Sequence, residues 1–159
     1  MNSYILKLVI AGGASNNKGQ TLELPSLSKP EIDALLEALD DEYRAWATYD
    51  QVIRDFGDVR PFINIREAEA RHIEALKRLF LAYGLSQPKN TWPGKVVRYI
   101  SLRQACEAGV AAEIENGDMY DRLLKSTDRS DILNVFRNLQ QASQQRHLAA
   151  FKRCVDREG

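Results

Sequence analysis

Hydrophobic residues recur at steps of three and four positions along four long stretches of this chain, which is the spacing of amphipathic helices. A capping sequence begins at Ser28 before the first stretch, and Gly57 follows that stretch. Gly84 and Leu85 have the arrangement that ends a helix after the second stretch. The pattern predicts an all-α fold with helices at about 29–57, 60–83, 96–126 (starting between 96 and 101) and 131–156.

The connections between these stretches restrict how the helices are arranged. Only a few residues join the first helix to the second, so these two helices are expected to be antiparallel neighbours. Residues 84–95 contain Pro88 and Pro93 and, when extended, are long enough to cross the bundle before the third helix begins. Residues 1–28 instead contain β-forming residues around a polar loop, which predicts a short N-terminal arm or strand pair beside a helical domain at 29–159.

Acidic and imidazole side chains interrupt the apolar faces of the predicted helices, where solvated residues are not expected. They are Glu42, Glu69, His72, Glu113 and His147. Glu69 and His72 are three positions apart and therefore project from one helical face, and the helical rise counted from Gly57 puts Glu42 at about the same level. A buried carboxylate needs a partner, and a metal ion is a common one. The pattern therefore predicts a buried metal site.

The second half of the chain repeats this arrangement with one change. Glu113 takes the place of Glu42, and Gln144-x-x-His147 takes the place of the earlier Glu-x-x-His sequence. Because Gln144 is neutral, it removes one negative charge and one bidentate ligand. We expect Gln144 to be at best a weak ligand, and a second metal ion to bind weakly or not at all.

The same glutamates have an alternative interpretation that involves no metal. Glu42 and Glu113 also suit a buried ion-pair network with an arginine, for which the candidates are Arg44, Arg71 and Arg146. Such a network is costly compared with apolar packing, because both charges lose their hydration.

Three further residues near the predicted site have two interpretations each. Tyr49 and Tyr120 follow the two single glutamates by seven residues, so each hydroxyl is expected to hydrogen-bond a ligand carboxylate, with a redox role as the alternative. Gly109 lies one turn before Glu113. Close packing of two helices is the expected reason for this glycine, and space for a small ligand is the alternative.

Composition excludes some classes of function. The chain has 159 residues, enough for one domain with a sizeable core, and a formal net charge of +0, so nucleic-acid binding is not expected. No stretch approaches the ~18 apolar residues of a membrane span. Cys106 and Cys154 lie on apolar faces and are expected to be buried free thiols, with a disulfide between facing helices as the alternative. A cytoplasmic location is the expectation.

Several short sequences connect these features to a known type of protein. They are Asp41-Glu42-Tyr43-Arg44-Ala45 with Tyr49, Phe62-x-Asn64-Ile65-x-x-x-Glu69-x-x-His72, Tyr83-Gly84-Leu85, Ala105-x-x-x-Gly109-x-x-x-Glu113, and Asn138-Leu139 with His147-Leu148-x-Ala150-Phe151. With them the chain resembles, over about residues 30–155, the ferritin-like superfamily of di-metal carboxylate bundles that includes rubrerythrins and ferritins. It is most similar to an uncharacterised family of prokaryotic ferritin-like domains.

The resemblance implies an up-down-down-up four-helix bundle with a long crossover between the second and third helices. The metal ligands that it implies are Glu42, Glu69, His72, Glu113 and His147. The implied cofactor is non-haem iron in a di-iron or mono-iron site, with Mn or Zn as alternatives, and the implied activity is that of an oxidoreductase reacting with O2 or H2O2. The alternative is a non-catalytic bundle with a structural or vestigial metal site that acts as an interaction scaffold. A homo-oligomer, a dimer, is expected, without nucleic-acid or membrane partners.

Overall fold

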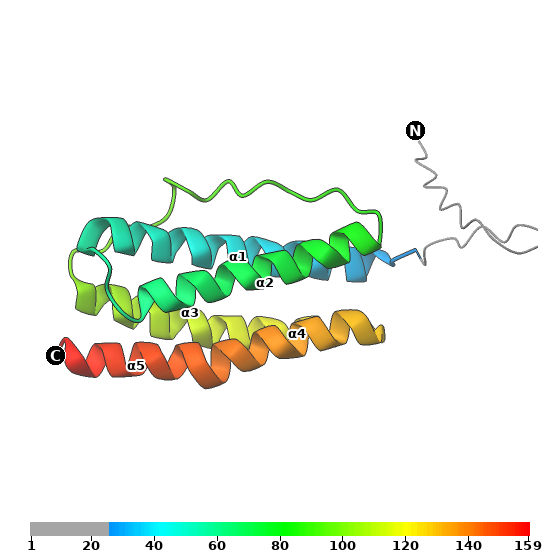
Figure 1. Cartoon of the computed structure of the whole chain (residues 1–159). Helices are drawn as coiled ribbons and strands as arrows, with labels where there is room; N and C mark the ends of the chain where they lie inside the picture. Colours follow the sequence, from blue (N-terminus) through cyan, green and yellow to red (C-terminus); the bar gives the residue numbers. More distant parts are fainter. Residues whose placement is uncertain (1–25) are drawn as a thin grey trace, which may run out of the picture.

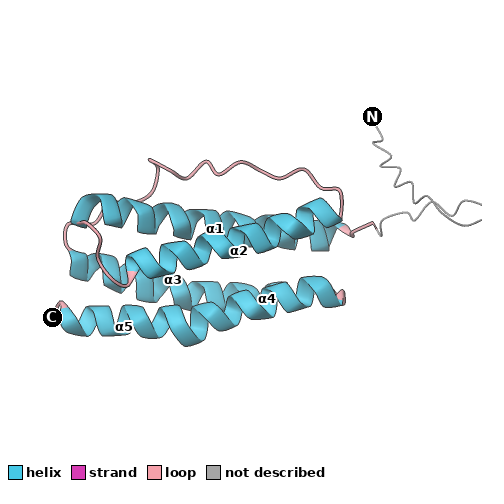
Figure 2. Cartoon of the chain, in the orientation of Figure 1, coloured by secondary structure: helices cyan, strands magenta, loops and turns pink. Residues whose placement is uncertain are grey.

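The computed structural model describes residues 26–159, and regular structure in this part of the chain is entirely helical (Figures 1 and 2). The helices are α1 Lys29–Phe56, α2 Phe62–Ala82, α3 Leu102–Leu123, α4 Ser130–Ala142 and α5 Leu148–Arg157. A π-helical turn, Ser143–His147, joins α4 to α5, so these two continue one another and the domain is a bundle of four long helices. The all-α prediction is confirmed for these residues. The predicted arm or strand pair at 1–28 lies almost wholly outside them.

The ends of the first two helices are those that the sequence predicts. The Ser28 hydroxyl accepts a hydrogen bond from the Glu31 N–H, and the Glu31 carboxylate accepts one of 2.8 Å from the Ser28 N–H, which completes a capping box. After α2, the Leu85 N–H donates to the carbonyl of Phe80 at 2.8 Å. Gly84 supplies the positive φ of 65° that this turn requires.

The segment between α2 and α3, residues 83–101, runs along the outside of the bundle (Figure 1). It returns the chain to the end of the bundle where α1 ends, and there Arg98 forms an ion pair with Asp55. The last turn of α5 lies at the same end, where the Arg157 side chain donates to the carbonyl of Arg60 at 2.9 Å. Consequently α2 and α3 run in the same direction, and α1 and α5 both finish where α3 starts (Figure 1).

Two hydrogen bonds fix the middle of this segment to α1. The Tyr43 hydroxyl donates to the carbonyl of Pro88 at 3.1 Å, and the indole N–H of Trp92 donates to Asp40 Oδ1 at 2.9 Å. The segment is therefore fixed along one side of α1.

The fourth long helix differs from its prediction in one respect. The sequence predicts an unbroken helix over 131–156, whereas the Leu148 N–H bonds the carbonyl of Ser143, five residues earlier. One extra residue in this turn rotates the helix that follows relative to the helix before it. Hydrophobic spacing does not reveal such a turn, because the apolar residues on either side of it keep a helical period.

Two apolar clusters fill the bundle, one on each side of its middle. The first contains Leu35, Leu39, Leu76, Phe80, Tyr120 and Phe136 among its largest members, and the second contains Tyr49, Phe62, Ile65, Phe151 and both cysteines. Each large side chain contributes roughly 1.5–3 kcal/mol by its burial. The polar residues singled out in the sequence lie between the two clusters.

The expectation of free thiols is wrong, because Cys106 and Cys154 form a disulfide between α3 and α5. Both cysteines are fully buried, and their Cα atoms are 5.8 Å apart, within the range that a disulfide spans. The facing of these two helices depends on tertiary packing, and for this reason the sequence left the disulfide only as the alternative.

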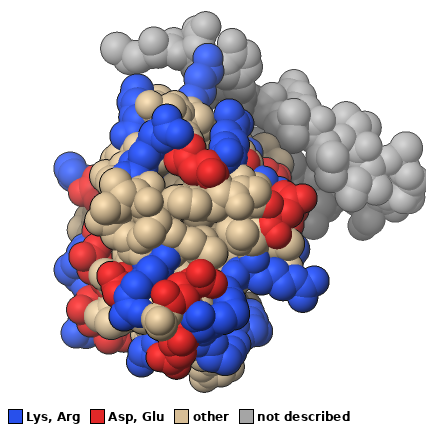
Figure 3. All heavy atoms as spheres, turned by 90° about the vertical axis from the view of Figure 1, so that its left-hand side faces the viewer, with Lys and Arg blue, Asp and Glu red and all other residues tan. Residues whose placement is uncertain are grey.

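Acidic and basic side chains are mixed on the face that Figure 3 shows. At the end of the bundle where α3 begins, neither sign forms a continuous patch, and an uncharged band crosses the face between charged groups (Figure 3). Within residues 26–159, every helix is too short or too polar to cross a membrane.

Candidate metal centre

Three glutamates and two histidines meet at the middle of the bundle. They form two overlapping groups, in each of which one donor atom from every member lies within 4.8 Å of the others. The groups are Glu42, Glu69 and His72, and Glu69, Glu113 and His147. All five residues predicted as metal ligands are therefore brought together, from α1, α2, α3 and the π-helical turn, and Glu69 belongs to both groups.

In the first group, the histidine lies close to both carboxylates. His72 Nδ1 lies 2.7 Å from Glu69 Oε2 and 3.1 Å from Glu42 Oε2. Because Glu69 and His72 are one turn apart on α2, the helix itself sets their relative position. Glu42 and Glu69 are almost fully buried, with 2% and 3% of their surface exposed, while 13% of the His72 side chain is exposed.

In the second group, the histidine lies farther from its two carboxylates. His147 Nδ1 lies 3.1 Å from Glu69 Oε1 and 3.6 Å from Glu113 Oε1. Neither contact is a hydrogen bond, so this buried nitrogen has no hydrogen-bond partner among residues 26–159. A buried, unpartnered imidazole nitrogen between two carboxylates fits a metal ion well, since such an ion would satisfy all of them.

Two tyrosines donate hydrogen bonds to carboxylates of the cluster, each to a glutamate in the other half of the chain. The Tyr49 hydroxyl donates to Glu113 Oε1 at 2.9 Å, and the Tyr120 hydroxyl donates to Glu42 Oε1 at 2.7 Å. Burial, together with the nearby glutamate charges, raises the pKa of both tyrosines well above the usual value. Both hydroxyls therefore remain protonated donors, and the predicted bonds to cluster carboxylates are present.

Without an ion, protons balance the charges of the cluster. Burial and the charge of Glu69 raise the pKa of Glu42 to about 8. Burial opposes the charge on each of the other groups, but their mutual contacts outweigh it. The pKa of Glu69 is lowered to about 2 by His147 and His72, that of His72 is raised to about 10 by Glu42 and Glu69, and that of His147 is raised to about 9 by Glu113 and Glu69.

The arginine network considered as an alternative is absent from the described residues. Arg44 pairs with Asp41 on its own helix rather than with Glu42 or Glu113. Arg71 and Arg146 form no ion pair within residues 26–159. The partners of the buried carboxylates are imidazoles and tyrosine hydroxyls instead.

The Gln144 side chain bonds the main chain and a neighbouring hydroxyl beside the cluster. Its side-chain amide donates to the carbonyl of Glu113 and, at 3.1 Å, to Ser143 Oγ. The side chain packs against Gly117, where an added Cβ would come within 2.5 Å of the Gln144 amide nitrogen. Gln144 thus helps to fix the π-helical turn to α3, and its role as a weak ligand stays a prediction.

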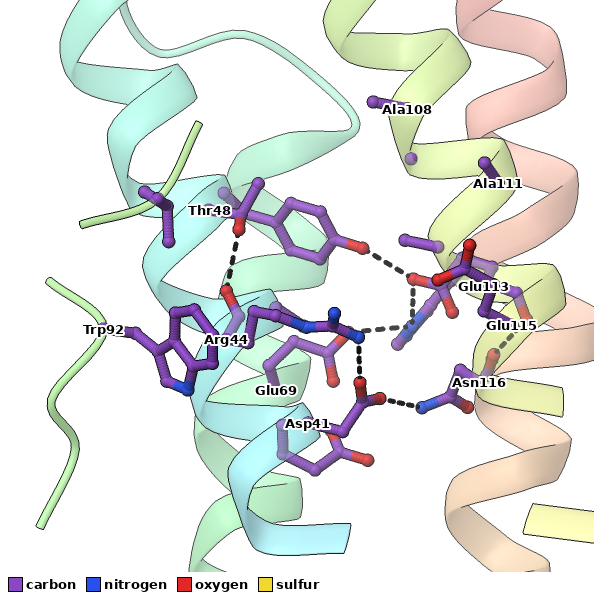
Figure 4. Close-up of a pocket in the computed structure, with 18 of the residues that line it drawn as sticks. Asp41, Arg44, Thr48, Glu69, Trp92, Ala108, Ala111, Glu113, Glu115 and Asn116 are labelled. Carbon is purple, nitrogen blue, oxygen red and sulfur yellow. Dashed lines mark hydrogen bonds and ion pairs between the residues drawn. The ribbon is translucent and has the colours of Figure 1, made fainter. Parts of the chain in front are cut away.

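A cavity of about 400 Å³ extends from the cluster to the surface between α1, α3 and the segment before α3 (Figure 4). Gly109 lines it, but this glycine is explained by close packing, since an added Cβ would lie 2.6 Å from the Phe151 ring. The sequence did not identify Asn116, whose Nδ2 donates to Asp41 Oδ2 at 2.9 Å beside the cavity. The available signal was spacing, because Asn116 is one turn after Glu113 on α3.

Comparisons with known proteins identify relatives without an assigned function. A family model described as "Uncharacterized protein domain (DUF2202)" matches residues 31–159. The chain is 28% identical to "Uncharacterized protein MJ0754" of Methanocaldococcus jannaschii over 148 residues, which covers 84% of this chain and 79% of that protein. It is also similar to the crystal structure of hypothetical protein MJ0754 from Methanococcus jannaschii, with a TM-score of 0.76, 24% identity, and coverage of 88% of this chain and 87% of that chain. The structural likeness establishes a shared helical fold.

Proposed function

This chain belongs to the DUF2202 family of uncharacterized protein domains, and on that premise we propose that it is a metal-binding protein of the ferritin-like type, with a non-haem iron or manganese site. The ligands are the three glutamates and two histidines of the cluster: Glu42, Glu69, His72, Glu113 and His147. The long connection before α3 supports the ferritin-like assignment, because such bundles have one long crossover connection.

Glu69 is the observation that carries this proposal. Its two carboxylate oxygens face different imidazoles, Oε2 at 2.7 Å from His72 Nδ1 and Oε1 at 3.1 Å from His147 Nδ1. A carboxylate that presents one oxygen to each of two donor groups has the disposition of a bridging ligand. If each group held an ion, Glu69 would be a ligand of both, which favours one joint site over two independent sites.

The donor types indicate which ions suit the site. Carboxylates and imidazoles favour Fe, Mn or Zn, and both cysteines are held in the disulfide rather than offered as thiolates. Redox-active ions held here would supply electrons to O2 or H2O2. The protein contributes the buried ligands, the tyrosine donors that orient Glu42 and Glu113, and two apolar clusters that exclude water on either side.

Gln144 favours a second, non-catalytic candidate function. Gln144 is turned towards the main chain of Glu113, and the cluster has three carboxylates, one fewer than a site to which each half of the chain supplies two. If the second group binds no metal ion, the protein holds a single structural ion in the first group. Consumption of O2 or H2O2 by the iron-loaded protein distinguishes the enzyme from this alternative.

Metal titration tests the proposal directly. Metal-free protein is titrated with Fe²⁺ without oxygen, and separately with Mn²⁺, and its metal content is measured after gel filtration. The wild type is expected to bind two ions, the second more weakly, and Glu69→Gln is expected to lose both. Glu67→Gln is the matched control, because that exposed carboxylate on the same helix pairs with Arg66. A wild type that retains no ion, or a Glu69→Gln variant that binds as well as the wild type, would contradict the proposal.

A further inference from the structure

The cavity beside the cluster is lined by small apolar side chains as well as by charged ones. Alanines of α3, including Ala105, Ala108 and Ala112, line it together with Val96 of the segment before α3. Its volume of about 400 Å³ falls in the range of roughly 300–1,000 Å³ that is typical of small-molecule sites. The small alanine side chains leave this space open, and they create an apolar path towards the buried carboxylates.

The charged groups that line the cavity are of both signs, and two of them are unpaired. Arg44 is committed to Asp41, whose other oxygen accepts from Asn116 (Figure 4). Lys95 and Glu115 also line the cavity, and neither forms an ion pair within residues 26–159. Among residues 26–159 the cavity therefore offers one cation and one anion that no ion pair holds, although the charge of Glu115 also acts on Arg44.

A third polar group in the cavity lacks a partner. The Oδ1 atom of Asn116 is buried and accepts no hydrogen bond among the described residues, although its Nδ2 is bonded to Asp41. A buried acceptor without a donor is unfavourable by about 1–3 kcal/mol. A ligand that carries N–H donors would remove this cost.

We propose that the cavity binds a small zwitterion, a free α-amino acid with an unbranched apolar side chain. Lys95 binds its carboxylate, Glu115 and the Oδ1 atom of Asn116 bind its ammonium group, and the side chain extends along Ala108 towards the cluster. This explains both unpaired charges and the unpartnered acceptor with one ligand, whereas a simple carboxylate or amine would satisfy only part of them. Binding does not require a metal ion, but the role of the amino acid as a substrate rests on the proposed metal function.

Three matched probes test the proposal: norleucine, hexanoate, which lacks the ammonium group, and pentylamine, which lacks the carboxylate. Binding of each is measured by calorimetry to metal-free and to Mn²⁺-loaded full-length protein. Norleucine is expected to bind at least roughly tenfold more tightly than either analogue, because each analogue loses a charged hydrogen bond. Lys95→Gln is expected to remove the advantage over pentylamine, and Glu115→Gln the advantage over hexanoate.

Further variants separate the cavity from the rest of the surface. Ala108→Leu is expected to weaken norleucine binding by filling the interior, while Ala82→Leu and Lys152→Gln, at exposed positions away from the cavity, leave it unchanged. Equal affinity for all three probes, no binding of norleucine, or normal binding by Ala108→Leu would overturn the proposal. Norleucine binding without metal binding would refute the proposed function alone, and metal binding without norleucine binding would refute this inference alone.

Discussion

The two halves of the cluster hold similar side chains on helices of different geometry. In the first half, Glu69 and His72 lie on a regular α-helix, and His72 Nδ1 contacts two carboxylates at 2.7 and 3.1 Å. In the second half, His147 ends a π-helical turn and its Nδ1 has no hydrogen bond among the described residues. Gln144 bonds the main chain where a fourth carboxylate would complete the symmetry. In the first half, the contacts between His72 and the two carboxylates fix the ligands without an ion. In the second half, interactions outside the cluster fix the helices.

The disulfide is the clearest of those interactions. Cys106 lies seven residues before Glu113 on α3, and Cys154 lies seven residues after His147 on α5. Each cysteine is therefore two helical turns from a member of the second group, and the disulfide joins α3, which carries Glu113, to α5, which follows His147 directly. The first half has no such crosslink, since α1 and α2 are joined by a short hairpin and by packing.

Removal of the disulfide is expected to have the largest effect. The two cysteines are 48 residues apart, so the double variant Cys106→Ala/Cys154→Ala should lose about 4 kcal/mol of unfolding free energy through a less restricted unfolded chain. Urea unfolding measures this loss. The second ion should also be weakened more than the first. If both ions are weakened equally, the crosslink does not support the second half selectively.

Removal of one carboxylate from each half tests whether the halves act separately. Glu42→Gln should weaken binding of the first ion, and Glu113→Gln binding of the second, each by at least about 100-fold because a direct ligand is lost. Calorimetric titration with Mn²⁺ measures both. Glu74→Gln is the control, since this exposed residue of α2 pairs with Lys77. Loss of both ions in either variant would mean that the cluster binds metal only as a unit.

Restoration of the missing carboxylate should reduce the difference between the halves. Gln144→Glu is expected to strengthen the second ion by roughly tenfold, because it adds a charged donor next to Glu113. In the metal-free state the same variant should be less stable than the wild type, since the new carboxylate would face the Glu113 carbonyl in place of an amide donor. Thermal unfolding with and without Mn²⁺ measures both changes. A variant that is destabilised equally in both states would show that Gln144 has only a packing role.

The tyrosines provide a smaller test in which the effects cross between the halves. Tyr49→Phe removes the donor to Glu113 and should weaken the second ion, while Tyr120→Phe removes the donor to Glu42 and should weaken the first. Roughly tenfold is expected in each case, at the lower end of what an outer hydrogen-bond partner contributes. Stepwise metal titration of both variants measures it. If Tyr49→Phe weakened the first ion instead, or Tyr120→Phe the second, the result would contradict the hydrogen bonds described above.

The dependence of stability on pH should distinguish the metal-free protein from the loaded one. The pKa of His72 is raised to about 10 and that of His147 to about 9 by the neighbouring carboxylates, in spite of burial. A raised pKa stabilises the fold fully below the unfolded value of 6.5, and this stabilisation is lost as pH rises through the folded values. Unfolding free energy should therefore fall between pH 6.5 and about 10 without metal, and the pKa of Glu42, raised to about 8, adds to this fall. With metal it should stay nearly constant, because metal binding already displaces these protons.

Local rules were sufficient to predict much of the fold. The capping box at Ser28 and the glycine turn after α2 depend on hydrogen bonds between residues that are close in sequence, and both were predicted. Helical period also identified all five members of the cluster, since a residue's face on a helix follows from its position. The π-helical turn was missed, because its i to i+5 hydrogen bond leaves the apolar period on either side intact.

The sequence by itself determined which residues face the interior and at what level of each helix they lie. Only the tertiary structure decided how those residues pair, because pairing depends on the rotation and separation of whole helices. It joined Cys106 to Cys154, directed Tyr49 to Glu113 in the other half of the chain, and turned Gln144 towards the main chain. The asymmetry between the two halves is visible in the sequence as a single glutamine, and its structural consequence follows from the packing of α3 against the π-helical turn.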